Sequence, residues 1–285
     1  MNDGCSPALL ELQQPLDPLT ADVLCVIHGV VTRLEQPYFL AGATARDILL
    51  VNAFGLPAGR ATEDIDFGVA VKSWADFHTL KSSLEQTGHF RCDPKMEQRL
   101  FYQGAIPVDI VPFGGICEDD GSIVWPPDQS MQMDVSGFAE ALQFAVRISP
   151  RDGWIIPLVS IPGLATLKLI AWIDRHNVNS KDAVDLYRLF SSYNEAGNLD
   201  RLWEQEIELL ESNRFDLRLA GAELLGRDVS RLCQPTTRQK LEKLLANERL
   251  LDQMESQIIS SLGGHDDTSG KFKVLMDQFI KGFMA

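Results

Sequence analysis

Two aspartates, Asp64 and Asp66, stand two residues apart in a stretch where apolar residues alternate with other types. Ile65, Phe67 and Val69 recur at the period of a pleated strand, which predicts that a strand begins here. Asp64 and Asp66 would then point to the same face, with Cα atoms roughly 7 Å apart. Adjacent carboxylates repel each other unless a cation lies between them, and Mg²⁺ prefers oxygen ligands. The spacing indicates either a divalent-cation site or an acidic, solvated start of a strand.

A third carboxylate, Asp109, lies between Val108 and Ile110 in a strand predicted over residues 106–113. A charged side chain inside an apolar strand is costly unless it is paired, bound to a metal or turned to solvent. If this strand runs beside the strand that carries Asp64 and Asp66, three carboxylates share one open face. The alternative is an exposed position on a one-sided sheet.

A candidate phosphate site precedes these acids in the chain. A strand is predicted over 38–41, and a helix is predicted to follow from Gly42 to Leu50. A strand that turns at a glycine into a helix aims free N–H groups and the positive end of the helix dipole at one point, which suits phosphate. Thr44 could add a hydroxyl donor, and Arg46 is either a phosphate ligand or a solvated helix residue. An ordinary strand–turn–helix connection is the alternative.

The elements that must position these residues change in character along the chain. Before Ser160, short strands alternate with helices, including helices over 19–36 and 73–86 and a hairpin at Gly104-Ala105. From Ile161 onward, only helical periodicity is present. The sequence therefore predicts an α+β fold with a mixed sheet flanked by helices over residues 1–160, followed by an all-helical domain over residues 161–285.

The helical part begins with a strongly apolar helix that carries Lys168 and Arg175 on one face. On such a helix a lysine either snorkels to solvent or reaches into a cleft to meet a phosphate. Asp182 and Asp185 fall in the first turn of the next predicted helix, where carboxylates suit the helix dipole.

Composition restricts the class of protein. The chain has 285 residues and a formal net charge of −14, which weighs against a surface that coats nucleic acid broadly but permits a local basic cleft. No run of 18 apolar residues and no signal-peptide pattern is present, so we expect neither a membrane span nor secretion. The five cysteines form no C-x-x-C pair, which fits a reducing cytoplasm.

Taken in order, these features resemble the DNA polymerase β-like nucleotidyltransferase superfamily. There, a Gly-Gly or Gly-Ser turn precedes an Asp-x-Asp strand, and a third acid follows on a neighbouring strand. Within it, the sequence is most similar to the AbiEii-type toxin nucleotidyltransferases of prokaryotic toxin–antitoxin systems. Residues 60–67 resemble their R-x-[ST]-x-D-[IL]-D-F strand, and residues 168–186 resemble their K-x₆-R…K-D-x-x-D-L motif. Ala43 departs from the pattern, because the family usually has Gly or Ser there.

The resemblance implies a role for each matching residue. Asp64, Asp66 and Asp109 would hold two Mg²⁺ ions, and Asp109 would help to deprotonate the acceptor hydroxyl. Lys168 would neutralise charge on the phosphates or the leaving pyrophosphate, and Asp182 would position Lys181 or the nucleotide. The residues expected to contact the nucleoside triphosphate are Gly42, Ala43, Thr44, Arg46, Arg175, Lys181 and Asp182.

The implied function is Mg²⁺-dependent transfer of a nucleoside monophosphate from ATP, GTP or CTP to an acceptor. The expected acceptor is RNA, such as a tRNA 3′ end, and the protein would be a cytoplasmic toxin with a cognate antitoxin as partner. Two alternatives remain open. The same fold could modify a protein hydroxyl or a small molecule such as an aminoglycoside, or the chain could be a non-catalytic scaffold.

Overall fold

The structure is a computed structural model that describes residues 9–60, 62, 64–127, 131–262 and 266–285. The chain divides into two compact units, Met1–Ser160 and Ile161–Ala285. No helix among the described residues combines the length and the apolar character that a membrane crossing requires. Cys25, Cys92, Cys117 and Cys233 are not disulfide-bonded, and Cys5 lies outside the described residues.

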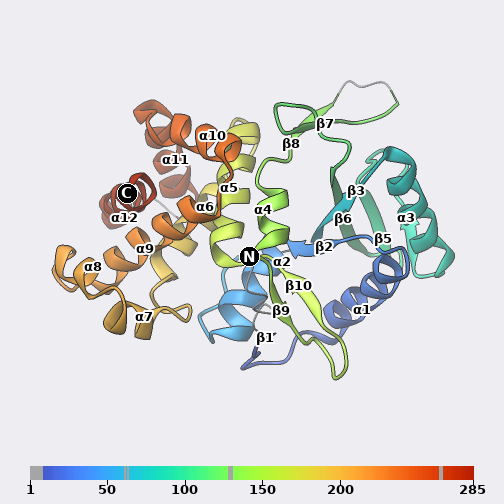
Figure 1. The fold of residues 1–285 in the computed structure, drawn as a ribbon, viewed down its shortest axis with the longest axis horizontal. Coiled ribbons are helices and arrows are strands. Elements are labelled where there is room, and N and C mark those ends of the chain that lie inside the picture. The colour runs from blue at the N-terminus through green and yellow to red at the C-terminus, as the bar shows by residue number, and fades with distance from the viewer. Residues whose placement is uncertain (1–8, 61, 63, 128–130, 263–265) are drawn as a thin grey trace, which may run out of the picture. The chain divides into compact units, whose positions relative to one another are not determined.

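A mixed sheet of eight strands forms the centre of the first unit as far as it is described (Figure 1). The strand order is β1-β9-β10-β2-β3-β6-β5-β4, and β3 runs parallel to β6 but antiparallel to β2. The strands are β1 (Leu9–Leu10), β2 (Tyr38–Ala41), β3 (Ile65–Val71), β4 (Phe90–Cys92), β5 (Arg99–Tyr102), β6 (Ile106–Gly114), β9 (Val146–Ile148) and β10 (Ile156–Leu158). The predicted α+β fold with a mixed sheet is confirmed.

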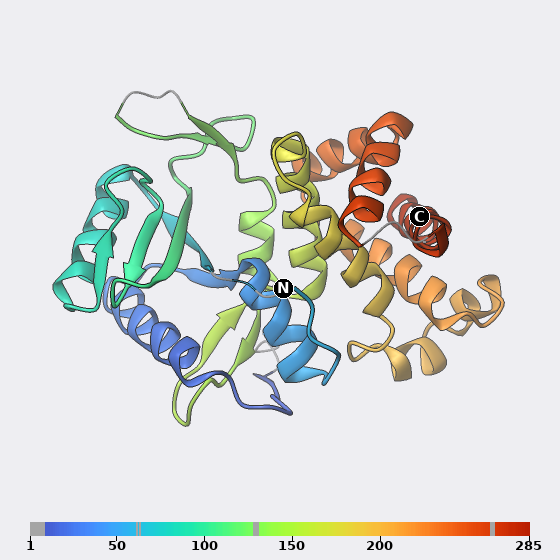
Figure 2. The same ribbon diagram turned by 180° about the vertical axis from the view of Figure 1, so that it is seen from behind.

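Helices cover both faces of this sheet. Helices α1 and α3 lie on one face and α4 lies on the other, as Figures 1 and 2 show from opposite sides. The helices of the unit are α1 (Pro18–Arg33), α2 (Gly42–Asp47), η1 (Ile48–Ala53), α3 (Trp74–Gln86) and α4 (Phe138–Gln143). Phe67 and Val69 are fully buried on the α1 side, where Tyr38 of β2 meets His28 of α1.

On the opposite face of the sheet, α4 covers the middle of β3, and Asp66 lies before the covered part. Near the middle of β3, Gly68 lies against Phe39 and Phe138, so α4 covers this part of the face. Strand alternation places Asp66 on the same side as Gly68, at the beginning of β3. The half-buried Asp66 therefore stands on the α4 face, two residues before the part that α4 covers.

Two local expectations differ from the structure. The helix predicted from Gly42 to Leu50 ends as α2 at Asp47 and continues as the π-helix η1 to Ala53. The acid-rich segment after Gly114 contains a small hairpin, β7 (Ser122–Val124) and β8 (Gln132–Asp134), which sequence analysis did not predict. Strands of three residues are too short to give a periodic signal, which explains the second difference.

The second unit contains helices alone among its described residues. They are α5 (Ile161–Arg175), α6 (Lys181–Ser192), α7 (Leu199–Glu204), α8 (Ile207–Ser212), α9 (Leu217–Leu232), α10 (Pro235–Leu245), α11 (Glu248–Ser261) and α12 (Asp266–Met284). Helix α12 packs closely on α9. At Gly282 the two backbones are so near each other that an added Cβ would lie 1.9 Å from the Glu223 carbonyl oxygen.

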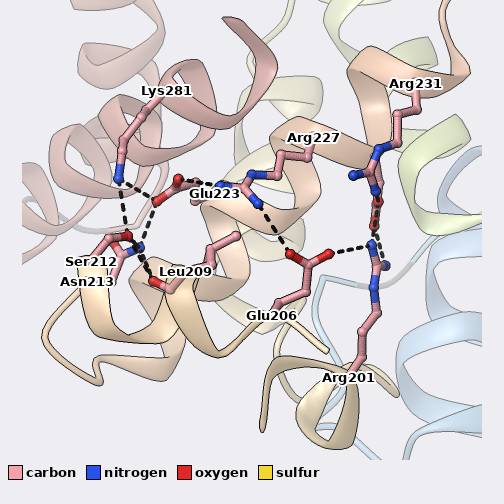
Figure 3. A network of polar contacts seen from close by, with 10 residues as sticks. Arg201, Glu206, Leu209, Ser212, Asn213, Glu223, Arg227, Arg231 and Lys281 are labelled. Carbon is pink, nitrogen blue, oxygen red and sulfur yellow. Dashed lines mark hydrogen bonds and ion pairs between the residues drawn. The ribbon is translucent and has the colours of Figure 1, made fainter. Parts of the chain in front are cut away.

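A polar network joins α9 to α7, α8 and α12 (Figure 3). The carboxylate of Glu223, which is 2% exposed, accepts hydrogen bonds from Asn213 at 2.7 Å and from Lys281 at 2.8 Å. Arg201 donates to both oxygens of Asp228, at 2.6 and 2.8 Å. The buried carboxylate of Glu223 and the half-buried carboxylate of Asp228 are bonded to side chains of the same unit, so this network holds the helices together.

Candidate active site

Strand register brings Asp66 and Asp109 together. Asp66 is directly opposite Ala41 on β2 and opposite Asp109 on β6, and Asp109 is in turn opposite Arg99 on β5. Directly opposite residues of neighbouring strands share a face of the sheet. Ala41, Asp66, Asp109 and Arg99 thus form one row across four strands, and Gly42 follows Ala41 at the end of β2.

Asp64 completes a carboxylate triad with Asp66 and Asp109. One carboxylate oxygen from each residue lies within 4.8 Å of the others, and all three residues are half-buried. Asp64 stands just before β3 rather than within it. The sequence pattern predicts this convergence, and the structure brings the three residues together.

The carboxylate triad fits a divalent cation by its chemistry and its spacing. Carboxylate oxygens are the ligands that Mg²⁺ prefers, and one such ion bridges oxygens with bonds of about 2.1 Å each. The observed separations of up to 4.8 Å are close to that span. An arrangement of three like charges is unfavourable without a cation, which also favours metal binding.

Gly42 is the corner residue against which Asp66 lies. Its φ is +69°, and a Cβ built on it would lie 1.8 Å from Asp66 Oδ2. A side chain at this position would therefore both strain the backbone and displace the carboxylate. Gly42 is thus placed at the triad, and Ala43 follows it in the first turn of α2.

Two threonines fix Asp64. Thr62 Oγ1 donates to Asp64 Oδ1 at 3.0 Å, and Thr44 Oγ1 donates to the Asp64 carbonyl oxygen at 2.9 Å. The Thr44 hydroxyl, which we expected to face a phosphate, is therefore directed to the main chain before β3 in this structure. The orienting role of Thr62 was missed by sequence analysis, although the residue belongs to the motif over residues 60–67.

Arg46 is buried, with 1% of its surface exposed. Its Nε donates to Asp47 Oδ1 at 2.8 Å, and its Nη2 donates to the Arg60 carbonyl oxygen at 3.0 Å. The interpretation of Arg46 as a solvated helix residue is wrong. Its guanidinium instead ties α2 to the segment that leads into the carboxylate triad.

Arg99 contacts the triad and was also missed. Its Nε and Nη2 each lie 2.7 Å from an oxygen of Asp109, and Nη2 lies 3.9 Å from Asp64 Oδ2. The hydrogen bond to Asp109 and the negative charge of the triad hold the pKa of Arg99 above its ordinary value. The guanidinium therefore remains charged and neutralises part of the triad.

The predicted residues of the helical part form a separate lysine cluster, defined as Lys168, Arg175, Asp182 and Asp185. Lys168 Nζ lies 2.9 Å from Asp182 Oδ1 and 2.8 Å from Asp185 Oδ2. Arg175 Nε and Nη2 donate to the two oxygens of Asp182 at 2.7 and 3.0 Å. Asp182 thus positions Lys168 and Arg175 here, whereas the exposed Lys181 has its backbone N–H bonded to Asn179 Oδ1 at 2.8 Å.

Burial strengthens the electrostatic interactions among the charged groups of this cluster. Asp182 and Asp185 are each 1% exposed, so a favourable position relative to the helix dipole does not account for them. Although burial alone would lower it, the two carboxylates raise the pKa of Lys168. Burial would likewise raise the pKa of Asp182, but Lys168 and Arg175 outweigh burial and lower it. Lys168 and Asp182 are therefore both charged at neutral pH.

Comparison with known proteins gives one family. The model of a family described as nucleotidyl transferase AbiEii toxin, type IV toxin–antitoxin system, matches residues 30–268. This span includes the carboxylate triad, Gly42 and the lysine cluster. No curated protein matches the sequence significantly.

Several solved structures are similar at low sequence identity. One is ANT(2″)-Ia in complex with adenylyl-2″-tobramycin, at 14% identity over 68% of this chain and 96% of that chain, with a TM-score of 0.38. An antigenic nucleotidyltransferase-like protein from Paracoccidioides brasiliensis shares 14% identity over 70% of this chain and 93% of that chain, with a TM-score of 0.40. The Thermotoga maritima CCA-adding enzyme complexed with tRNA shares 12% identity over 94% of this chain and 82% of that chain, with a TM-score of 0.26.

Proposed function

This chain belongs to the nucleotidyl transferase AbiEii toxin family, and we propose that it transfers a nucleoside monophosphate from a nucleoside triphosphate to RNA. The proposed acceptor is a hydroxyl of RNA, such as a tRNA 3′ end, and the proposed cofactor is Mg²⁺. The single observation that supports this activity is the convergence of Asp64, Asp66 and Asp109, whose oxygens lie within 4.8 Å of one another.

The chemistry requires little more than positioning and charge neutralisation. Divalent ions held by the carboxylate triad would polarise the phosphate and lower the pKa of the acceptor hydroxyl. The hydroxyl oxygen forms a bond to the α-phosphorus, the bond from that phosphorus to the β-phosphate oxygen breaks, and pyrophosphate leaves. Asp109 is the proposed acceptor of the hydroxyl proton, because it belongs to the triad and lies on its own strand beside Asp66.

The remaining residues would hold the triphosphate. Gly42, Ala43 and Thr44 begin the helix beside Asp66, and a helix start directs backbone N–H groups outward. Arg46 would act by keeping the segment before β3 in place, since its guanidinium is bonded to the Arg60 carbonyl. In the helical domain, residues 161–285, we propose that Lys168, Arg175, Lys181 and Asp182 serve the phosphates.

The test of this function measures pyrophosphate and label transfer. Purified protein with Mg²⁺ and bulk cellular RNA should release pyrophosphate with at least one of ATP, GTP, CTP and UTP, and α-³²P should appear in RNA. Asp66→Asn should lower this rate at least about a hundredfold, because mutation of a residue that only contacts a metal ligand already lowers metal affinity or activity by about 10–100-fold. The exposed Asp119→Asn is the matched control and should keep full activity. Absence of pyrophosphate release with every nucleotide would refute the proposal.

A second acceptor class is favoured by charge. The catalytic unit holds most of the chain's excess of acidic residues, and an acidic surface attracts cationic acceptors such as aminoglycosides. Label recovered on an aminoglycoside or on a protein hydroxyl, with none on RNA, would establish this alternative. Binding of a partner without nucleotide or Mg²⁺ binding in calorimetry would instead indicate a non-catalytic scaffold.

The family also supports a biological role. Its description places it in type IV toxin–antitoxin systems, so we propose that this chain is the toxin and that a cognate antitoxin protects the cell. Expression of the wild-type chain should arrest growth, and expression of Asp66→Asn should not. Growth arrest by both would separate toxicity from nucleotide transfer.

A further inference from the structure

Arg99 lies where a divalent cation would compete with it. Cross-strand pairing sets Arg99 of β5 directly opposite Asp109 of β6. The guanidinium donates to both oxygens of Asp109 at 2.7 Å, and the side chains are only 23% and 13% exposed. This bidentate, partly desolvated geometry is the strongest form of an Arg–carboxylate contact.

The same contact occupies the carboxylate that the triad contributes from β6. A hard divalent ion needs at least one oxygen of Asp109 with its lone pairs directed to the ion, while the guanidinium engages both oxygens. The positive charge of Arg99 also opposes a second cation nearby, since Nη2 lies 3.9 Å from Asp64 Oδ2. Arginine cannot lose its proton in a protein, so the guanidinium cannot relieve this opposition by becoming neutral and can relieve it only by moving away.

We propose that Arg99 is a resident counter-cation of the triad, which holds Asp109 in the metal-free protein and is displaced from it by the divalent ion. The inference rests on the proposed function, because it assumes that the triad binds such an ion. It assigns Arg99 two opposite effects: it stabilises the metal-free protein, and it weakens the affinity of the triad for metal.

The alternative is that Arg99 orients Asp109 permanently and stays bonded to it beside the metal. The two cases differ in the sign of one measurement. If Arg99 competes, its removal tightens metal binding. If Arg99 orients Asp109, its removal loosens metal binding, as the loss of other partners of metal ligands does.

The experiment is calorimetric titration of Mn²⁺ and of Mg²⁺ into wild type and Arg99→Gln, without nucleotide. Arg99→Gln should bind each ion at least about tenfold more tightly, which is the lower range for losing a competing charged hydrogen bond. In EDTA its Tm should be lower than that of wild type, and the ion should raise the Tm of the variant by more. Arg99→Lys keeps the positive charge but loses the bidentate guanidinium, so its metal affinity should lie between those of wild type and Arg99→Gln. This variant replaces Arg99→Gln in the titrations if Arg99→Gln does not fold.

The matched control is Arg201→Gln in the helical unit. Arg201 also donates to both oxygens of an aspartate, Asp228, through Nη1 and Nη2 at 2.6 and 2.8 Å. This variant should lose stability equally in EDTA and in Mg²⁺, and its metal affinity should equal that of wild type.

Each outcome is decisive. Tighter binding in Arg99→Gln supports the inference, also in the case where wild type binds too weakly to measure. Equal or weaker binding by a folded Arg99→Gln, beside measurable binding by wild type, overturns the inference and leaves the proposed function standing. Absence of binding in wild type, Arg99→Gln and Arg99→Lys overturns both.

Discussion

The carboxylate triad and the lysine cluster are built from the same kinds of charged groups in opposite proportions. In the first unit, three carboxylates meet the guanidinium of Arg99, and the Asp64 side chain is 42% exposed. In the second unit, Lys168 and Arg175 face Asp182 and Asp185, whose side chains are 1% exposed. One site carries an excess of negative charge near solvent, and the other pairs two cations with two carboxylates, of which Arg175 alone is exposed and Lys168, Asp182 and Asp185 are buried.

The carboxylate triad would be stabilised by an added cation, whereas the carboxylates of the lysine cluster already have cationic partners in the protein. Burying a charge is costly unless it is paired, so the balanced lysine cluster is stable as it stands. The triad places three carboxylates close together, and the repulsion among them is available to favour the binding of a divalent ion. Charge proportion and exposure together therefore distinguish a site that favours an added cation from one whose carboxylates already have cationic partners.

The largest expected effect comes from making the same amide substitution in both sites. Asp182→Asn leaves buried Lys168 with one carboxylate and should lower the free energy of unfolding by about 3 kcal/mol or more. Asp64→Asn removes one of three repelling charges and keeps an oxygen for Thr62, so its unfolding free energy in EDTA should equal or exceed that of wild type. Urea denaturation, with hydrogen exchange of α6 amides to locate the effect, measures both. Comparable losses in both variants would abolish the distinction.

The next effect is metal-dependent stabilisation of the first unit alone. At a Mg²⁺ concentration of one hundred times Kd, binding should add about 2.7 kcal/mol to the unfolding free energy. Hydrogen exchange should slow in β3 and β6 and stay unchanged in α5 and α6. Asp66→Asn should remove this response, and Asp182→Asn should keep it. Slowed exchange confined to α5 and α6 would indicate that the metal binds at the lysine cluster and not at the carboxylate triad.

Sequence analysis found the features that depend on local pattern. Alternation from Ile65 to Val69 predicted β3, helical periodicity over 73–86 predicted α3, and the position of Asp109 in an apolar strand predicted its convergence with Asp64 and Asp66. Each of these needs only the residues of one element and its neighbour.

Arg99 was missed because register depends on the turn. A two-residue connection at Gly104-Ala105 would pair Asp109 with Leu100. The structure has a three-residue turn in which Gln103 and Gly104 have φ of 49° and 72°, so Tyr102 pairs with Ile106 and Arg99 with Asp109. A shift of one residue exchanges the faces of a strand, which no pattern of apolar residues in β5 reveals. The pairing of Lys168 with Asp182 and Asp185 was missed for a similar reason, since it arises from the packing of α5 on α6.

A smaller effect is expected at the corner beside the triad. In Gly42→Ala the new Cβ would lie 1.8 Å from Asp66 Oδ2, so the carboxylate must move, and metal affinity should fall by about 10–100-fold. Gly88→Ala is the matched control, because Gly88 has φ of +75° and a Cβ added there would meet nothing within 4 Å. It should share the backbone strain and leave the metal affinity unchanged. Equal losses of affinity in both variants would attribute the effect to strain rather than to the carboxylate.

The smallest expected effect is at Thr62, which contacts the triad without belonging to it. Its hydroxyl donates to Asp64 Oδ1 at 3.0 Å, and Thr62→Val keeps the shape while removing this hydrogen bond. Metal affinity should fall by about tenfold, the lower range for a partner of a metal ligand, while stability in EDTA changes little because Asp64 is partly exposed. Thr79→Val on α3, where the hydroxyl bonds only to the Ala75 carbonyl, should change neither quantity. If Thr62→Val binds metal as wild type does, then the ion itself, and not the protein, orients Asp64, and the triad would be less preorganised than the lysine cluster with which it is compared.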